Sequence, residues 1–267
     1  PLLGLIDVTI VGHLGSPAYI GAIAVGGMLF NIIYWIFGFL RMGTSGMTSQ
    51  AYGQHDLNEI NRLLIRSVGV GLFIALCLLI LQYPILNAAF TLIQTTEEVK
   101  QLATTYFYIC IWGAPAMLGL YGFAGWFIGM QNSRFPMYIA ITQNIVNIIA
   151  SLSFVYLLDM KVAGVAAGTL IAQYAGFFMA ILLYMRYYST LRKRIVWKDI
   201  IQKQAMYRFF RVNRDIFFRT LCLVIVTMFF TSAGAAQGEV VLAVNTLLMQ
   251  LFTLFSYIMD GFAYAGE

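Results

Sequence analysis

Acidic side chains inside apolar stretches are the first residues of this 267-residue sequence that could do chemistry. Asp7 lies in the run PLLGLIDVTIVG, and the nearest Lys or Arg along the chain is Arg41. Desolvation in a membrane disfavours the charged form of a carboxyl group, which lets the group take up and release protons near neutral pH. We interpret Asp7 as a candidate cation-coupling residue. The alternative is an ionised, hydrogen-bonded Asp at a helix end, because Gly12 follows closely.

Uncharged polar side chains form stripes on two neighbouring apolar segments. Asn144, Asn147 and Ser151 follow i, i+3, i+7 spacing, which places them on one face of a helix. Thr169 and Gln173 follow i, i+4 spacing on the next segment. Such stripes either hold helices together or line a hydrated cavity. Asn144, Asn147, Thr169 and Gln173 are therefore candidate substrate or ion ligands.

Three charged residues accompany the apolar segments near the end of the chain. Asp260 and Glu267 share a heptad-spaced face, and either is able to neutralise Arg219 or Arg41. A second ion site or a gating site is the alternative. The signatures GxSxG, GxxxxGK[ST] and HExxH do not occur in the sequence, so we expect neither an enzyme nor a metal site.

Membrane-spanning helices are the elements that must position these residues. The sequence is 61% hydrophobic and 10% charged, whereas soluble proteins are about 25% charged. A run of about 20 apolar residues spans a bilayer as a helix, and no alternating pattern indicates a barrel. We expect an all-α polytopic membrane protein with about seven and a half transmembrane helices, the half being residues 1–12. The seven charge-free windows are 18–40, 67–96, 101–133, 135–158, 162–185, 220–238 and 240–259.

Prolines and glycines refine these windows. Pro84 and Pro115 predict a helix end or kink inside two of the longer windows, because proline removes a backbone hydrogen bond. Small residues four apart favour close helix contact, and they occur at Gly125 and Gly129 and again at Gly164 and Gly168.

Basic residues predict the orientation. Of the 16 Lys and Arg, only Lys100 and Lys161 fall in one set of alternate connections. Cytoplasmic loops carry the excess of Lys and Arg, so the other connections face inward. The segment 191–206 is then a cytoplasmic linker, either an amphipathic helix on the membrane surface or a solvated connection. It divides the chain into 1–190 and 207–267. Topology accounts for the basic residues, so we expect no nucleic-acid partner.

Several runs of the sequence resemble one transporter family. LIDVTIVGHLGSPAYIGAIAVG is similar to the first-helix Asp, outer loop and second helix of the multidrug and toxic compound extrusion (MATE) family. FGFLRMGTSGMTSQAYGQHD looks like the end of its second helix, and GAPAMLGLYGFAGWFIGMQNSRFPM and VAGVAAGTLIAQYAG like its fourth and sixth helices. The run from FFRTLCLVIV to the end resembles the DinF-like branch.

The resemblance implies a bundle of twelve helices in two six-helix lobes, of which this sequence would hold the first two thirds, cut at both ends. It implies a secondary active antiporter that exports organic, often cationic and amphipathic compounds by alternating access, without a cofactor. We expect a monomer in the bacterial cytoplasmic (inner) membrane. It also implies a cation-coupling role for Asp7 and pocket roles for Asn144 and Thr169.

Two departures from the family pattern bear on the coupling ion. Ile148 stands where the family often has an acid, which favours H⁺ over Na⁺, because Na⁺ requires several oxygen ligands. Arg219 stands where the NorM-like branch tends to have Glu, which favours the DinF-like branch. The alternatives are a flippase for lipid-linked intermediates, which would need a large cationic cavity, and a membrane enzyme or scaffold that does not transport.

Overall fold

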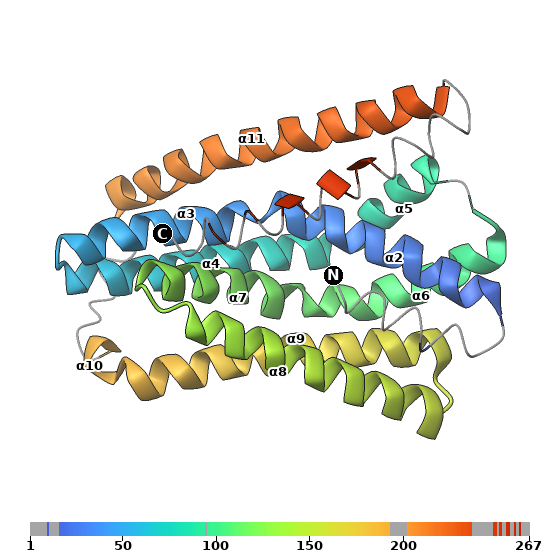
Figure 1. Cartoon of the computed structure of the whole chain (residues 1–267), viewed down its shortest axis with the longest axis horizontal. Helices are drawn as coiled ribbons and strands as arrows, with labels where there is room; N and C mark the ends of the chain where they lie inside the picture. Colours follow the sequence, from blue (N-terminus) through green and yellow to red (C-terminus); the bar gives the residue numbers. More distant parts are fainter. Residues whose placement is uncertain are drawn as a thin grey trace.

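The structure is a computed structural model that describes residues 10, 16–93, 95–192 and 202–236, together with 248–249, 251–252, 255–256, 259 and 262. The described elements are helices that run side by side along one long axis (Figure 1). The described residues contain five segments long and apolar enough to cross a membrane, which confirms the predicted all-α polytopic fold. They are Pro17–Gly53, Leu57–Ile80, Glu97–Gly129, Arg134–Leu157 and Lys161–Tyr187.

The first segment consists of α2 (Pro17–Ile36) and α3 (Phe39–Gly53). Ser16 caps α2, because its side chain accepts a hydrogen bond from the Ala18 backbone N–H at 3.3 Å. The predicted window stops at residue 40, but the helix continues to Gly53. It does so because α3 buries a row of small and hydroxyl side chains, including Thr44 and Thr48, against other helices.

The second segment is α4 (Leu57–Ile80), which is followed by the short α5 (Gln82–Leu92). The predicted charge-free window 67–96 starts too late, because the helix begins at Leu57. Asp56 starts α4 well before that window, because its side chain accepts hydrogen bonds from the N–H groups of Asn58 and Glu59. The helix is interrupted at Leu81, and Pro84 lies in the first turn of α5. This is the helix end that Pro84 predicts from the sequence.

The third segment bends where Pro115 predicts a kink. It consists of α6 (Glu97–Cys110), a 3₁₀ turn (Ile111–Gly113) and α7 (Ala114–Gly129), with Pro115 in the first turn of α7. The contact of α7 with α3 confirms the predicted small-residue packing. At Gly125 the Arg41 carbonyl fills the space for a side chain, and a β-carbon at Gly129 would lie 2.6 Å from the Thr48 Cβ.

The last two spans pair closely with each other. They are α8 (Arg134–Leu152), extended by a π turn (Ser153–Leu157), and α9 (Lys161–Tyr187), which ends at the short α10 (Ser189–Arg192). Gly164 packs against Phe154 and Gly168 against Ser151, so the second predicted pair of small residues also forms a close helix contact.

The helix α11 (Lys203–Ala236) lies on the side of α2 and α3, across the bundle from α8 and α9 (Figure 1). It includes most of the window 220–238, whereas most of 240–259 is outside the described residues. Residues 193–201 are also outside the described residues, so the division of the chain at 191–206 stays a prediction.

The helix α7 lies between these outer helices. It packs against α3, α4 and α9, and it contributes the fully buried Trp126 and Phe127.

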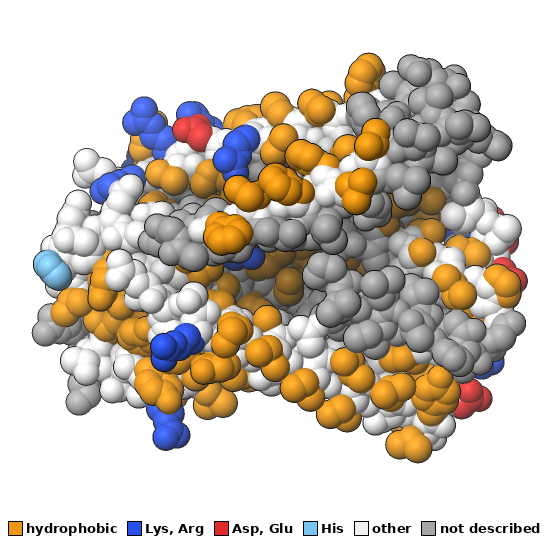
Figure 2. Space-filling model, viewed as in Figure 1, with side chains coloured by type: hydrophobic (Ala, Val, Ile, Leu, Met, Phe, Trp, Pro, Cys, Tyr) orange, Lys and Arg blue, Asp and Glu red, His pale blue; other side chains and the backbone are white. Residues whose placement is uncertain are grey.

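The two ends of the bundle differ in charge (Figure 2). The turns at 54–56 and 130–133 and the start of α11 lie at one end, where Arg134 and Arg208 are exposed. The other end carries Glu97 and Glu98 beside Lys100. The structure therefore gathers the basic connections at one end, and the assignment of that end to the cytoplasm stays a prediction.

Candidate functional site

The polar stripes of α8 and α9 meet inside the bundle. Asn147 on α8 donates a hydrogen bond from Nδ2 to the hydroxyl of Thr169 on α9 at 3.1 Å. Asn147 is only 1% exposed, and Thr169 is half-buried. The structure thus brings together two residues that the sequence places only on separate helix faces.

One helical turn along α8, Ser151 continues the polar surface. Its side chain is buried against Gly168, where any side chain larger than hydrogen would collide with its hydroxyl. Within the described part of the chain, the Ser151 hydroxyl and the Oδ1 atom of Asn147 have no hydrogen-bond partner. Buried polar groups in proteins are nearly always hydrogen-bonded to protein, water or ligand. These two oxygens are therefore available to a group that the described residues do not supply.

Gln173 extends the site toward a third helix. Its Oε1 lies against Gly113 in the turn before α7, and its side chain faces the hydroxyl of Tyr34 on α2. Both oxygens are buried without a partner at hydrogen-bond geometry among the described residues. Sequence reasoning missed Tyr34 and Gly113. The available signals were a tyrosine inside the apolar window 18–40 and a glycine just before Pro115.

Asn144 does not join this group in the structure. Its Nδ2 donates to the Ala140 carbonyl of its own helix at 2.6 Å, and the residue is half-buried. Ile148, which stands where the resembling family often has an acid, is also half-buried on α8. The polar cluster therefore consists of Tyr34, Asn147, Ser151, Thr169 and Gln173.

The predicted charged site residues are only partly described. Asp7, Asp260 and Glu267 lie outside the described residues. Arg219 is exposed on α11, and its Nη2 lies 3.7 Å from the Met42 sulfur on α3. Within the described ranges, no group of three His, Cys, Asp or Glu side chains is placed to hold a metal ion.

At the basic end of the bundle, a second buried polar network joins four helices. Asn61 on α4 is 1% exposed; its Nδ2 donates to the Leu191 carbonyl at 3.0 Å, and its Oδ1 accepts from the Tyr184 hydroxyl at 2.6 Å. The indole N–H of Trp126 donates to the Ile60 carbonyl at 2.8 Å. These bonds fix α4, α7, α9 and α10 to one another.

Tyr188, just after α9, covers this network. Its ring centroid lies 4.8 Å from that of Trp126, and its hydroxyl oxygen accepts a hydrogen bond from Asn132 Nδ2 at 3.4 Å. Burial raises the pKa of the Tyr188 hydroxyl, so this group stays protonated at physiological pH.

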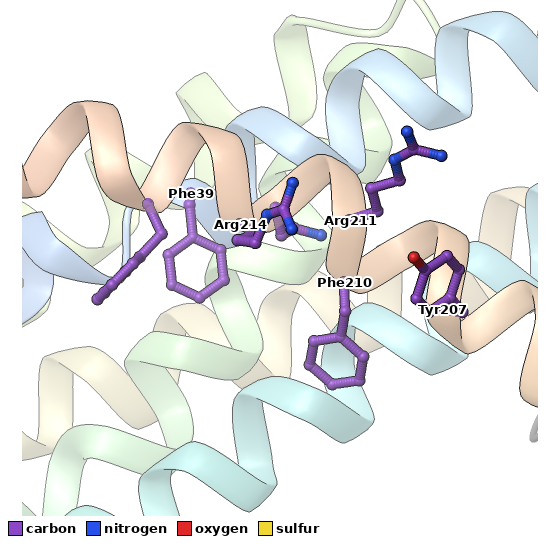
Figure 3. A pocket seen from close by; sticks show the side chains of 7 residues that line it. Phe39, Tyr207, Phe210, Arg211 and Arg214 are labelled. Carbon is purple, nitrogen blue, oxygen red and sulfur yellow. The ribbon is translucent and has the colours of Figure 1, made fainter.

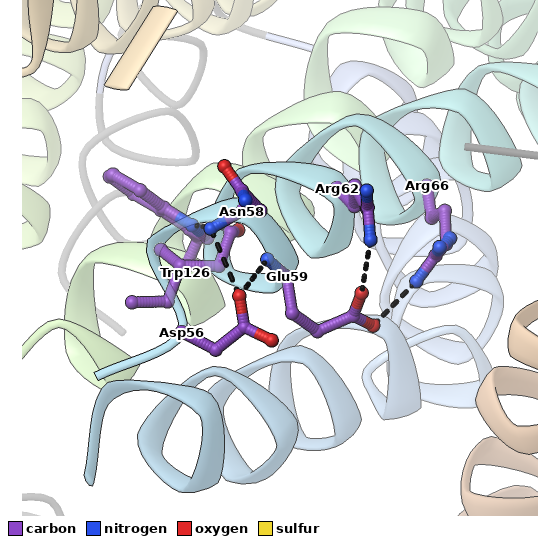
Figure 4. A network of polar contacts seen from close by, with 7 residues as sticks. Asp56, Asn58, Glu59, Arg62, Arg66 and Trp126 are labelled. Atoms are coloured by element: carbon purple, nitrogen blue, oxygen red, sulfur yellow. Dashed lines mark hydrogen bonds and ion pairs between the residues drawn. The ribbon is translucent and has the colours of Figure 1, made fainter. Parts of the chain in front are cut away.

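A buried arginine lies beside the same network (Figure 4). Arg66 on α4 is 3% exposed, and its Nη1 lies 2.7 Å from Glu59 Oε1. The guanidinium of Arg62 approaches the other carboxylate oxygen of Glu59 at 3.8 Å. From the sequence, Arg66 is only one of the basic residues near a connection. Its burial was not predicted, because spacing along α4 does not show which face of the helix other helices cover.

Comparison with known proteins gives a consistent family assignment. The family model described as MatE matches residues 1–153. DNA damage-inducible protein F of Escherichia coli (strain K12) is 36% identical over 276 residues, an alignment that covers all of this chain and 58% of that protein. Multidrug and toxin extrusion protein 1 of Danio rerio is 28% identical over 189 residues, which is 69% of this chain and 30% of that protein.

Solved structures agree on the fold. A structure described as a MATE in the bent conformation superposes with a TM-score of 0.87 at 22% sequence identity, and covers 99% of this chain and 59% of its own. This likeness shows the fold alone. Where nearly all of the chain is aligned, it spans slightly less than three fifths of the length of the relative.

Proposed function

The chain belongs to the MatE family, and on that premise we propose that the protein exports organic, often cationic and amphipathic compounds in exchange for an inward flow of cations. One observation supports this proposal more than any other. The Asn147–Thr169 pair, Ser151, Gln173 and Tyr34 give the bundle a buried polar surface. Its side-chain oxygens lack partners among the described residues, except for the Thr169 hydroxyl, which accepts the Asn147 bond. A cation or a hydrogen-bonding substrate supplies the groups that such acceptors require.

In this proposal Asp7 is the coupling residue. Deprotonated Asp7 attracts a cationic compound, and protonation from the outside releases the compound outward through alternating access. The second family acid is replaced by Ile148, and the cluster offers amide and hydroxyl groups in place of carboxylates. A single carboxyl group is enough to carry a proton, whereas a Na⁺ ion would lack the second family carboxylate as a ligand in this lobe. We therefore propose H⁺ as the coupling ion in preference to Na⁺.

The test is efflux by the full-length protein in proteoliposomes, driven by a pH gradient and, separately, by a Na⁺ gradient. We expect Asp7→Asn to abolish pH-driven efflux. The matched control is Asp159→Asn, the same chemical change at an exposed turn between α8 and α9, and it should leave efflux intact. Undiminished pH-driven efflux by Asp7→Asn would exclude the proposed role, and efflux driven only by Na⁺ would exclude proton coupling.

We further propose that the protein works as a monomer in the bacterial cytoplasmic membrane, with the linker 191–206 in the cytoplasm. The basic end of the bundle supports this orientation, because Lys and Arg are retained on the cytoplasmic side. A single cysteine in place of His55 should react with an impermeant reagent only in inverted vesicles, and one in place of Glu98 only in intact cells. Labelling in the opposite pattern would reverse the orientation.

A further inference from the structure

A groove beside α11 has no part in the proposed transport cycle. It is a cavity of about 360 Å³ between the first half of α11 and the start of α3 (Figure 3). On α11 its lining residues recur every three or four positions, so they share one helical face. The lining residues are Phe39, Tyr207, Phe210, Arg211, Asn213, Arg214 and Phe217.

The walls of the groove are aromatic. Phe39 from α3 packs edge-to-face on Phe217 with ring centroids 5.8 Å apart. Tyr207 and Phe210 are 68% and 51% exposed, although they are large apolar side chains on an otherwise charged stretch of helix. Tyrosine is enriched at membrane–water interfaces, where its ring lies in an apolar region and its hydroxyl in a polar one, and Tyr207 fits this pattern; the Phe side chains make the rest of the wall apolar.

Two guanidinium groups supply the charge. Arg211 and Arg214 lie along α11 between Phe39 at one end and Tyr207 at the other (Figure 3). Arg214 contacts its neighbour Asp215 at 3.1 Å, but both side chains are more than half exposed, so water screens the pair. No carboxylate of the described residues lies within ion-pair distance of Arg211. Among the described residues, the groove therefore has a positive charge at Arg211 that no carboxylate compensates, beside its apolar walls.

The position of the groove in the bundle indicates which kind of ligand it binds. It lies at the basic end of the bundle, where Lys203 precedes the lining residues on α11 and Arg208 lies between Tyr207 and Phe210. Basic pockets between helices on the cytoplasmic side attract anionic lipid headgroups, and the planar arginine fork matches a phosphate group. We propose that this groove binds an anionic phospholipid of the inner leaflet. Its phosphate contacts Arg211 and Arg214, and the upper part of an acyl chain lies along Phe39 and Phe210.

The test uses the full-length protein in nanodiscs of phosphatidylcholine doped with phosphatidylglycerol, with retained lipids counted by native mass spectrometry. We expect Arg211→Gln/Arg214→Gln to lower the preference for phosphatidylglycerol by about 25-fold, since each of the two basic residues near the membrane surface contributes on the order of a fivefold effect. Arg186→Gln, an exposed change at the end of α9 outside the groove, should leave the preference unchanged. Arg211→Lys/Arg214→Lys should retain a part of it.

A second measurement does not depend on the folding of the glutamine variant. A photo-crosslinking amino acid in place of Phe210 should give an adduct with the mass of phosphatidylglycerol, and free inorganic phosphate should not compete with it. Three outcomes would overturn the proposal. They are an unchanged lipid preference in the double variant, an equal loss in Arg186→Gln, and a crosslink from position 210 to another segment of the full-length protein.

Discussion

The side-chain amide of Asn147 donates its hydrogen bond to the Thr169 hydroxyl at 3.1 Å, while its carbonyl oxygen has no partner among the described residues. One half of the amide thus fixes α8 to α9, and the other half remains available inside the bundle. A residue that served only to hold the two helices together would need only the donor half of the amide. The pair therefore combines a structural bond with a candidate ligand for a cation or a substrate.

Thr169→Val should remove the acceptor of this bond with little change in side-chain volume. We expect a loss of about 0.6 kcal/mol from the interhelical bond, rising to about 1–3 kcal/mol if the buried Asn147 donor finds no new partner. The measurement is thermal unfolding of the purified protein. Thr105→Val is the matched control, because the exposed Thr105 hydroxyl donates to the Gln101 carbonyl of its own helix and not to a neighbouring helix in the described part of the chain. Equal melting temperatures for the two variants would show that the bond contributes nothing.

Tyr34→Phe should separate function from stability. Among the described residues, the Tyr34 hydroxyl is buried next to Gln173 without a partner at hydrogen-bond geometry, so its removal should leave the melting temperature unchanged or raise it. If that hydroxyl contacts a transported compound or its water, the KM for efflux should rise several-fold. Tyr138→Phe, an exposed change on α8, is the control for efflux. A fall in melting temperature without a change in KM would assign the hydroxyl a structural role.

Gly43→Ala should disrupt the contact of α3 with α11. Asn213 on α11 is 2% exposed, and its Oδ1 occupies the space that a side chain at Gly43 would need. Overpacking of this kind costs about 1–3 kcal/mol, which should lower the melting temperature. The same change at Gly46, on an open face of α3, should be neutral or stabilising by up to about 1 kcal/mol, because alanine favours helix.

A double variant tests the cause of that loss. Asn213→Ala should recover stability in the Gly43→Ala background, because it removes the colliding oxygen. If the double variant is no more stable than Gly43→Ala, the contact between these two residues is not the reason.

Arg66→Gln should destabilise the protein more than Arg62→Gln, although both arginines contact Glu59. Arg66 is buried at 2.7 Å from the carboxylate, whereas Arg62 lies at 3.8 Å with a side chain that is 25% exposed. Breaking a buried pair costs up to about 3–5 kcal/mol, less here because Glu59 is partly exposed, and an exposed pair is worth about 0–1 kcal/mol. Chemical unfolding in detergent measures the difference, and similar values for both variants would contradict it.

The sequence pattern alone predicts the approximate spans, the helix breaks and several close helix contacts. Five of the seven apolar windows correspond to spans in the described part of the chain, although not with exact bounds, because a membrane helix must be apolar over a fixed length. Pro84 and Pro115 located the breaks, because proline lacks a backbone donor. Gly125, Gly129 and Gly168 were recognisable as contact positions, since only small residues allow two helices to approach closely. The polar stripes that contain Asn147 and Thr169 were also readable from spacing alone, although spacing does not show that they face each other.

Only the tertiary structure decided which residues are partners. Spacing along a helix defines a face, but the rotation and crossing of neighbouring helices decide what that face meets. The structure therefore paired Asn147 with Thr169, turned Asn144 back to its own helix, and brought Tyr34 to Gln173 from a distant part of the chain. The burial of Arg66 beside Glu59 and of Asn213 against Gly43 follows from the same packing, and no pattern within one helix predicts it.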